Sequence, residues 1–478
     1  MNKYKPTIGL EIHVELNTKS KMFCSCKNDA LEKRPNFNIC PVCTAQPGSL
    51  PVANEEAIRK TIKAGLALNC QINKESKFDR KNYFYPDLPK GYQISQYDKP
   101  FAENGFLQID NKNIGITRIH LEEDTGRLVH SGNESLVDFN RAGIPLMEMV
   151  TEPDITSGKE ARKFSQELQL VFRYLGISSA DMEKGQMRVE VNISISGDNK
   201  LGTKVEIKNL NSFRVVEKAI DYEIARQEEV LDDKEKVIQE TRGWDEKKQV
   251  TASQREKEQA HDYRYFPEPD LPTFHFDEDY ISKIKTEIPE MPWAKRIRLK
   301  QEYGLDESTI ENFVYNKDLG EYFEKVMSEL TNWLGKKDQK ITNLAVNYIV
   351  TDFWALFEKA PIEELEEKVD PEDFAELIKM IHKQEISSKI AKQVLQEMFK
   401  TGADPSHIVQ EQGLAQIGDT IELEKIVKDV IWQNPKPVED FKKGKENALQ
   451  FLAGQVMAKT RGRANPKIVQ QLLKKNLK

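Results

Sequence analysis

The segment from Ile8 to Leu16 alternates apolar and polar or ionisable residues almost without a break, and this pattern strongly constrains the fold. A β-strand has a side-chain period of two, so the alternation predicts a strand with one face in a core. The apolar face would carry Ile8, Leu10, Ile12, Val14 and Leu16, and the opposite face Glu11, His13 and Glu15. Two carboxylates and an imidazole could hold a hard cation, although an ordinary solvent-facing strand shows the same pattern.

The length of 478 residues exceeds what one hydrophobic core usually supports, so we expect several domains. The chain has no apolar run of 18 or more residues and no apolar signal core at its start, which predicts a cytoplasmic protein. A net charge of -7 argues against a protein that coats nucleic acid with its whole surface. Residues 441–478 nevertheless hold ten Lys or Arg and one acid, so a local basic module is expected.

The pattern of apolar residues changes near Pro289 and Pro292. Before them, short alternating runs and turns predict a largely antiparallel β-sheet domain; after them, a period near 3.6 predicts helices. The segment 401–405, with Gly402 and Pro405, breaks the helical part. The predicted class is therefore multidomain α+β, with a sheet domain at 1–293 and two all-helical domains at 294–407 and 408–478.

Four of the five cysteines form two close pairs, Cys24-x-Cys26 and Cys40-x-x-Cys43. Paired thiolates at this spacing can surround one tetrahedral Zn²⁺, and a site closed by four thiolates is structural. Two disulfides are the alternative, which a cytosolic chain disfavours. The fifth, Cys70, ends a helical apolar stripe and is expected to be a buried, inert thiol.

Further oxygen ligands fall on other expected strands. Residues 188–195 alternate so that Glu190 and Asn192 share a polar face, and residues 203–208 alternate again after a turn, which predicts a hairpin. The string at 120–124 adds three acids beside His120. Together these segments could bind Mg²⁺ or Mn²⁺ with a nucleotide.

The chain contains no standard phosphate loop and no dinucleotide-binding glycine motif. ATP would therefore have to be held by a carboxylate-bound metal and by basic side chains, with Lys81 and Arg141 as candidates. Residues 81–97 interleave tyrosines with Lys and Pro. Such a segment can stack on nucleobases or line a polar tunnel, and it can equally be a loop fixed by amphipathic rings.

These motifs resemble one protein family. The segments that carry the similarity are GLEIHVEL at 9–16, KFDRKNYFYPD at 77–87, HLEED at 120–124, LVDFNRAGIPLME at 136–148, TEPD at 151–154, DYRYFPEPD at 262–270, SSKIA at 387–391 and ANP at 464–466. They resemble the B subunits of the tRNA-dependent glutamyl/aspartyl amidotransferases, the GatB family, over the whole chain.

The resemblance implies an activity and partners. Such a protein works with an amidase A subunit and a small C subunit on misacylated tRNA(Gln) or tRNA(Asn). It uses ATP and Mg²⁺ to phosphorylate the side-chain carboxylate of the attached Glu or Asp. Ammonia released from glutamine in the amidase subunit then passes through a channel and displaces the phosphate, because phosphorylation supplies the leaving group that a carboxylate lacks.

The resemblance also implies site residues. The expected catalytic residues are Glu11, His13, Glu123, Glu152 and Lys81, and the expected Mg²⁺ ligands are Glu11, His13, Glu123, Glu152, Glu190 and Asn192. The residues expected along the ammonia path and at the substrate are Lys81, Tyr83, Lys90 and Arg141. A structural zinc at Cys24, Cys26, Cys40 and Cys43 occurs in only part of the family.

The basic C-terminal segment resembles the helical tail with which this family holds the tRNA elbow. The expected phosphate contacts are Lys442, Lys443, Lys445, Lys459, Arg461 and Arg463, and a solvated basic helix is the alternative. Two other functions compete with that of an amidotransferase component: a non-catalytic, zinc-stabilised tRNA-binding adaptor and a free-standing glutamine-using ligase. An adaptor has no need for convergent acids, and a free-standing ligase needs a glutaminase nucleophile, for which the sequence offers no good candidate.

Overall fold

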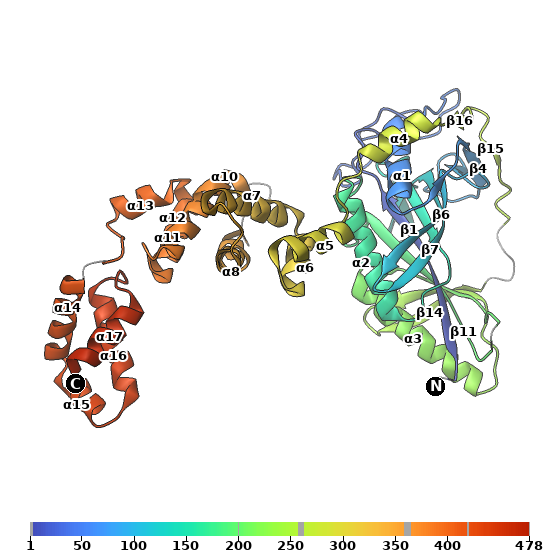
Figure 1. Ribbon diagram of the computed structural model, residues 1–478. Helices are drawn as coiled ribbons and strands as arrows, with labels where there is room; N and C mark the ends of the chain where they lie inside the picture. Colours follow the sequence, from blue (N-terminus) through green and yellow to red (C-terminus); the bar gives the residue numbers. More distant parts are fainter. Residues whose placement is uncertain (1–2, 199, 257–261, 358–364, 418–419, 478) are drawn as a thin grey trace. The chain divides into compact units, whose positions relative to one another are not determined.

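A computed structural model describes residues 3–198, 200–256, 262–357, 365–417 and 420–477 of the chain. The chain forms two compact units, Met1–Pro292 and Trp293–Lys478 (Figure 1). The first unit is built around a β-sheet and the second is helical, which confirms the expected multidomain α+β class. The division lies one residue from the expected position. The further boundary expected at 407/408 falls inside α13 (Pro405–Glu411) and stays a prediction.

A nine-stranded sheet forms the centre of the first unit, in the order β14-β13-β12-β11-β1-β10-β7-β6-β2. Its strands are β1 (Lys5–Glu15), β2 (Gln71–Ile72), β6 (Ala102–Ile109), β7 (Lys112–Glu123), β10 (Pro145–Thr151), β11 (Met187–Ser196), β12 (Val205–Lys208), β13 (Glu240–Asp245) and β14 (Val250–Glu256). Neighbours are antiparallel except β12 and β13. The β11–β12 pair confirms the predicted hairpin.

Strand β1 lies near the middle of the sheet, between β10 and β11. Its alternating apolar residues are buried: Ile8, Leu10, Ile12 and Val14 are each at most 1% exposed, as the sequence predicted. On the other face, Glu11 lies opposite Glu190 of β11, and His13 lies opposite Glu148 of β10. The strand therefore supplies core residues to one side and ionisable residues to the other.

Helices α1 (Glu55–Ala67), α2 (Gly158–Tyr174) and α3 (Phe213–Asp232) pack against the apolar side of the sheet (Figure 1). Each begins with a side-chain cap, from Asn54, Ser157 and Ser212, which satisfies an otherwise unpaired backbone N–H. Buried residues such as Phe164 and Ile220 join the strand residues in one core. With this face covered by helices, the polar face is left for a site.

Three small sheets and one helix complete the first unit. They comprise β15 (Phe266–Pro267) with β4 (Asp79–Asn82) and β5 (Tyr92–Ser95), β16 (Phe274–His275) with β3 (Glu75–Ser76), β8 (Arg127–Ser131) with β9 (Glu134–Asp138), and helix α4 (Glu278–Thr286). The first of these sheets carries the aromatic and basic segment after Lys77, and β5 also contacts β7 of the large sheet.

The second unit contains helices throughout its described residues. They are α5 (Pro292–Tyr303), α6 (Glu307–Tyr315), α7 (Lys317–Leu334), α8 (Gln339–Asn347), the π-helix η1 (Tyr348–Phe353), α9 (Trp354–Phe357), α10 (Leu365–Lys368), α11 (Pro371–His382), α12 (Ser388–Thr401), α13, α14 (Thr420–Gln433), α15 (Pro435–Lys442), α16 (Glu446–Lys459) and α17 (Pro466–Leu477). Helix α12 is capped by the side chain of Ser387 and ends, at the predicted break, at Gly402 in a left-handed conformation. Over the described residues, no helix is long and apolar enough to cross a bilayer.

Candidate functional site

The polar face of the large sheet forms the floor of a cavity of about 670 Å³. Acidic, imidazole and basic side chains line it from five adjacent strands, and Lys81 and several aromatic side chains line it from the segments around β4 and β15. The main lining residues are Glu11, His13, Lys81, Tyr83, Arg118, His120, Glu122, Asp124, Glu148, Arg188, Glu190, Asn192, Lys204, Glu206, Lys208, Tyr263 and Tyr265. The cavity belongs entirely to the first unit.

Strand register builds the acidic centre of this cavity. Glu148 of β10 lies directly between His13 of β1 and His120 of β7 in the sheet. Its carboxylate Oε2 is 3.4 Å from Nε2 of His13 and 3.3 Å from Nε2 of His120. Glu122, two residues along β7, is 3.9 Å from the same nitrogen of His13. Opposite pairs in adjacent antiparallel strands are close neighbours, so the register alone brings these groups together.

Three groups of side chains in the cavity have ligand atoms close enough to bind one ion each. The first consists of Glu11, His13 and Glu148, the second of His120, Glu122 and Glu148, and the third of Glu11, Glu190 and Glu206. In the third, Nζ of Lys208 lies 2.6 Å from Glu190 and 3.3 Å from Glu206. Carboxylates with an imidazole suit a hard divalent cation, so the donor set fits Mg²⁺ or Mn²⁺.

Glu148 and His120 stay charged in the acidic centre although they are buried. Burial favours the neutral form of Glu148, but His120 and His13 outweigh it and hold the pKa of Glu148 well below its usual value. Burial also disfavours the charged form of His120, yet Glu148 and Glu122 raise the pKa of His120 to about 9. Burial, and then the charge of Glu148, raise the pKa of Glu11. The cavity thus presents ionised carboxylates in a partly desolvated place.

The structure does not bring Glu123 and Glu152 into this cavity, contrary to expectation. Glu123 follows Glu122, so on β7 it points to the opposite side, where it accepts hydrogen bonds from Nζ of Lys90 at 2.7 Å and from the backbone N–H of Ile94. Glu152 comes after the end of β10, beyond a break in register with β7, and is exposed. There it accepts a hydrogen bond from Thr117. Glu122 and Glu148 lie in the cavity where Glu123 and Glu152 were expected.

The other expected site residues divide between two places. Lys81 and Tyr83 line the cavity. Burial disfavours the charge of Lys81, but Glu122 and Glu148 outweigh it and raise the pKa of this lysine. Lys90 instead lines a separate pocket of about 260 Å³. Arg141 donates from Nε and Nη2 to the backbone carbonyls of Thr125 and Gly126, so its guanidinium holds a loop beside the cavity.

The 260 Å³ pocket lies between the cysteine-containing loops and the Lys90–Glu123 ion pair. Cys24 and Cys43 contribute to one side of it, and Tyr92 and Asp270 to others. Glu122 and Glu123 are adjacent in β7, so their side chains point to opposite sides of the strand. Glu122 faces the acidic cavity and Glu123 faces this pocket.

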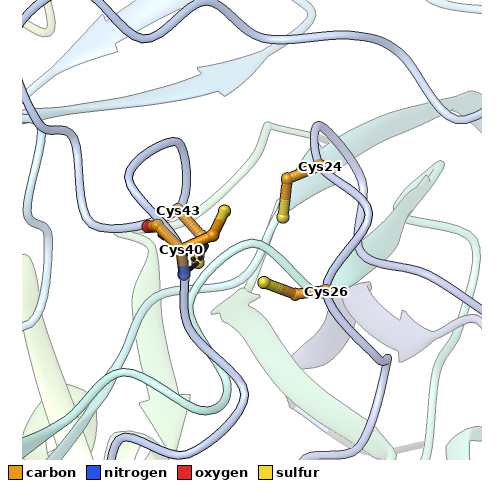
Figure 2. Close-up of side chains that lie close together, drawn as sticks. All are labelled: Cys24, Cys26, Cys40 and Cys43. Carbon is orange, nitrogen blue, oxygen red and sulfur yellow. Dashed lines mark hydrogen bonds between the residues drawn. The ribbon is translucent and has the colours of Figure 1, made fainter.

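The four clustered cysteines meet as the sequence predicted (Figure 2). Their sulfur atoms all lie within 4.8 Å of one another, with no disulfide among the chain's cysteines. The Sγ atoms of Cys40 and Cys43 are 3.8 Å apart, close to the edge of about 3.8 Å for a tetrahedron of Zn–S bonds near 2.3 Å. The donor set therefore fits a structural zinc. Cys70 is buried, and burial raises the pKa of its thiol to about 12, as expected for an inert residue.

The basic residues of the tail are partly paired with acids. Lys443 lies 3.7 Å from Glu439 and Lys445 lies 3.0 Å from Asp440. Lys459 pairs with Asp429, and Arg463 donates to the backbone carbonyls of Thr460 and Gly413. Over the described residues, Lys442 and Arg461 have no such ion pair and are exposed, so among the six expected phosphate contacts their charges are the most available to another molecule.

Comparison with known proteins gives the family. The model of the GatB/GatE catalytic domain matches residues 6–282, and that of the GatB domain matches residues 321–477. The aspartyl/glutamyl-tRNA(Asn/Gln) amidotransferase B subunit of Carboxydothermus hydrogenoformans is 48% identical over 488 residues, which cover 100% of this chain and 99% of its own. The proteins of that name from Thermotoga neapolitana and Persephonella marina are 49% and 48% identical, over 99% or more of both chains. The resemblance seen in the motifs is thereby confirmed, and the chain belongs to the GatB family, the B subunits of the aspartyl/glutamyl-tRNA(Asn/Gln) amidotransferases.

Proposed function

We propose that this chain phosphorylates the side-chain carboxylate of Glu-tRNA(Gln) or Asp-tRNA(Asn) with ATP and then amidates it with ammonia. It would act in a heterotrimer with a glutamine-hydrolysing A subunit and a small C subunit. The name of the relatives supports the tRNA-dependent amidation. The observation that carries the phosphorylation step is the buried, ionised Glu148 between two histidines on the floor of the cavity.

The residues that would hold the cation are Glu11, His13, Glu122 and Glu148, with Glu190, Asn192 and Glu206 beside them. This set keeps four of the ligands expected from the sequence and replaces Glu123 and Glu152. Mg²⁺ bound with ATP would neutralise negative charge on the phosphates during phosphoryl transfer. The ring nitrogen of His13 and the carboxylate of Glu148 lie 3.4 Å apart, so little rearrangement is needed to bring both to one ion.

Basic side chains around the same cavity would orient the anionic substrates. Lys204 and Lys208 line the cavity on the β12 side, and Arg118 lines it from β7. Lys81 reaches it from β4, where the acids favour its charged form. An ammonium at this position can hold the carboxylate that receives the phosphoryl group. Tyr83, Tyr263 and Tyr265 would exclude water from the reacting end.

Lys90 and Glu123 would act in the ammonia path rather than in phosphorylation. Their ion pair lines the 260 Å³ pocket and faces away from the acidic cavity. Tyr83 accompanies Lys81 on the cavity side, and its hydroxyl donates to Gln93, whose side chain in turn donates to the backbone carbonyl of Glu123. Polar side chains thus run from the pocket toward the cavity, as a path for a small polar molecule requires.

Neighbouring glutamates on β7 provide a matched test of the proposal. In the heterotrimer, Glu122→Gln should slow ATP-dependent phosphorylation of Glu-tRNA at least ~100-fold, because it removes a carboxylate from the acidic centre. Glu123→Gln should keep phosphorylation within ~3-fold and reduce only the glutamine-dependent amidation. Equal losses of phosphorylation in the two variants would contradict the assignment of the cavity.

A zinc-stabilised tRNA-binding adaptor without catalysis is the second candidate. It would explain the four cysteines and the basic tail. It gives no reason for five strands to direct ionised carboxylates and histidines into one cavity, since burying charged groups costs desolvation energy even when they are paired. Loss of phosphorylation in Glu122→Gln, with tRNA binding unchanged, would separate the two functions.

The tail would bind the tRNA backbone through Lys442 and Arg461 more than through the lysines paired with acids. Replacing Lys442 and Arg461 together by Ala should weaken tRNA binding about 10-fold at 0.15 M salt and lower the salt slope of log Kd by about 2. Lys459→Ala is the control, because its charge is already balanced by Asp429. A salt titration of tRNA binding measures both variants, and equal effects would count against this role for Lys442 and Arg461.

A further inference from the structure

Lys21 is a lysine with no exposed surface, and it lies beside the four-cysteine cluster. It is among the largest side chains in the described part of the chain that are completely buried. Lysine is almost never fully buried unless its charge is paired. A group near Lys21 should therefore balance its charge.

The contacts of the Lys21 ammonium are two backbone carbonyls and one sulfur atom. Nζ donates to the carbonyl of Asn38 at 2.8 Å and to the carbonyl of Phe139 at 3.2 Å. It lies 3.8 Å from Sγ of Cys43. Over the described residues, no carboxylate lies within 4.0 Å of this nitrogen. The carbonyls satisfy its hydrogen bonds, but they carry no net charge.

A four-thiolate zinc site supplies the missing negative charge. Four thiolates around Zn²⁺ leave a net charge of about -2 on the cluster, and this charge is itself partly buried. An ammonium at 3.8 Å from one sulfur stabilises that charge far more strongly in the protein interior than it would in water. The buried cation and the buried anionic cluster therefore offset each other's desolvation cost.

We propose that Lys21 is the charge-balancing residue of the four-cysteine site and that it slows loss of the metal. Asn38 lies in the loop that leads to Cys40, and Phe139 lies in the segment after β9, so Lys21 also joins the cysteine loop to that segment. This inference rests on a metal at the four cysteines. It does not depend on the amidotransferase chemistry.

The chain contains a suitable control lysine in the same loop. Lys27 follows Cys26, but 70% of its side chain is exposed and it pairs with Asp29 at 2.8 Å. A surface ion pair of this kind contributes little to stability. Lys27→Met should therefore leave the metal site unchanged.

The test compares Lys21→Met, Lys21→Gln and Lys21→Arg with Lys27→Met in the full-length protein. Lys21→Gln can still donate to a carbonyl but has no charge, so it separates the charge from the hydrogen bonds. Zinc content of the purified proteins is measured first, followed by the rate of zinc transfer to a colorimetric chelator. We expect Lys21→Met and Lys21→Gln to release zinc at least ~10-fold faster than wild type, and Lys21→Arg and Lys27→Met to stay within ~2-fold.

Cobalt substitution gives a readout that a purely structural role would not change. A cation near a thiolate lowers the energy of the sulfur lone pairs, so its removal should shift the thiolate-to-cobalt charge-transfer band to longer wavelength. Lys21→Gln should show this shift while keeping the visible bands of tetrahedral Co²⁺. If neither neutral variant folds with zinc present while Lys21→Arg folds and holds zinc, the need for a positive charge is supported.

Three results would overturn the proposal. The first is a folded Lys21→Gln variant that releases zinc at the wild-type rate and shows the wild-type charge-transfer band. The second is faster release from Lys21→Arg equal to that from Lys21→Met, which would point to packing instead of charge. The third is a wild-type protein that neither contains zinc as purified nor takes it up.

Discussion

The four-cysteine cluster and the acidic cavity both gather metal-binding side chains, but they are built over very different distances along the chain. The cluster takes all its ligands from residues 24–43, within two loops. The cavity takes its acids from β1, β7, β10, β11 and β12, between Glu11 and Glu206. One site is made by local spacing, and the other exists only when the sheet has its native register.

The two sites also differ in what they leave open. Four sulfur atoms within 4.8 Å of one another can complete a tetrahedron around one metal ion, which would leave no coordination position for a substrate. The acidic centre lies on the floor of a cavity of about 670 Å³, with basic side chains around it. We therefore propose a role in stability for the first site and in chemistry for the second, and each proposal can be tested separately.

The largest expected effect is on catalysis, from Glu148→Gln. This change removes the central carboxylate between His13 and His120 and should slow phosphorylation at least ~1,000-fold, or about 4 kcal/mol of activation free energy. Single-turnover phosphorylation of Glu-tRNA measures it. The matched control is Glu152→Gln, which changes the same residue type outside the cavity and should stay within ~3-fold. If the Glu152 variant were as slow as the Glu148 variant, the conclusion that, of the two acids, only Glu148 acts in phosphorylation would be contradicted.

An intermediate effect is expected on stability when the metal is removed from the cysteine cluster. A metal present at about 100 times its dissociation constant stabilises the folded state by about 2.7 kcal/mol, and a strong chelator removes that contribution. Chemical denaturation with and without chelator measures the difference. Proteolysis should then cleave between Cys26 and Cys40, while the sheet core persists because the residues that form it lie outside 24–43. Unchanged stability would mean that the cluster does not hold a structural metal.

We expect no alkylation of Cys70 in the folded protein, in contrast to the four clustered cysteines. Burial raises the pKa of its thiol to about 12, so at pH 8 only about one thiol in 10,000 is ionised, and the thiolate is the reactive form. After chelation, iodoacetamide at pH 8 should label the four clustered cysteines and leave Cys70 unmodified until the protein is denatured. Mass spectrometry identifies the labelled residues. Rapid labelling of Cys70 in the folded protein would show that it is accessible.

Local patterns predicted much of the fold. The alternation in β1, the β11–β12 hairpin and the break in the helices at Gly402 all depend on neighbours in sequence, and each was confirmed. The same holds for the cysteine cluster. In the cavity, Glu11, His13, Glu190 and Asn192 were found because each lies on a strand whose polar face is visible in the sequence.

The sequence could not identify which acid of a pair would face the cavity. Glu122 and Glu123 are adjacent, and the side-chain period of two sends them to opposite sides of β7. His120 and Glu122 are two residues apart and so lie on the same face of the strand, which was the one clue that Glu122 faces the cavity. Glu148 was missed because it is the single charged residue in the apolar strand β10, where only its cross-strand neighbours reveal a role.

Composition also overstated the basic character of the tail. Ten basic residues after Phe441 suggested a continuous cationic surface, but Lys443, Lys445 and Lys459 have acidic partners in the fold. Two of these partners, Glu439 and Asp440, lie just before the basic segment, and Asp429 lies on α14. A count restricted to the basic segment cannot detect neutralisation by acids that lie before it.

Because β1 supplies residues to both the core and the acidic centre, mutations in this strand can affect both. Because odd and even positions of one strand serve the hydrophobic interior and the acidic centre, deletion of a single codon within it would exchange the two sets downstream of the lesion. Most substitutions would damage one role and spare the other. Evolution can therefore tolerate substitutions in this strand, but not insertions or deletions of single residues.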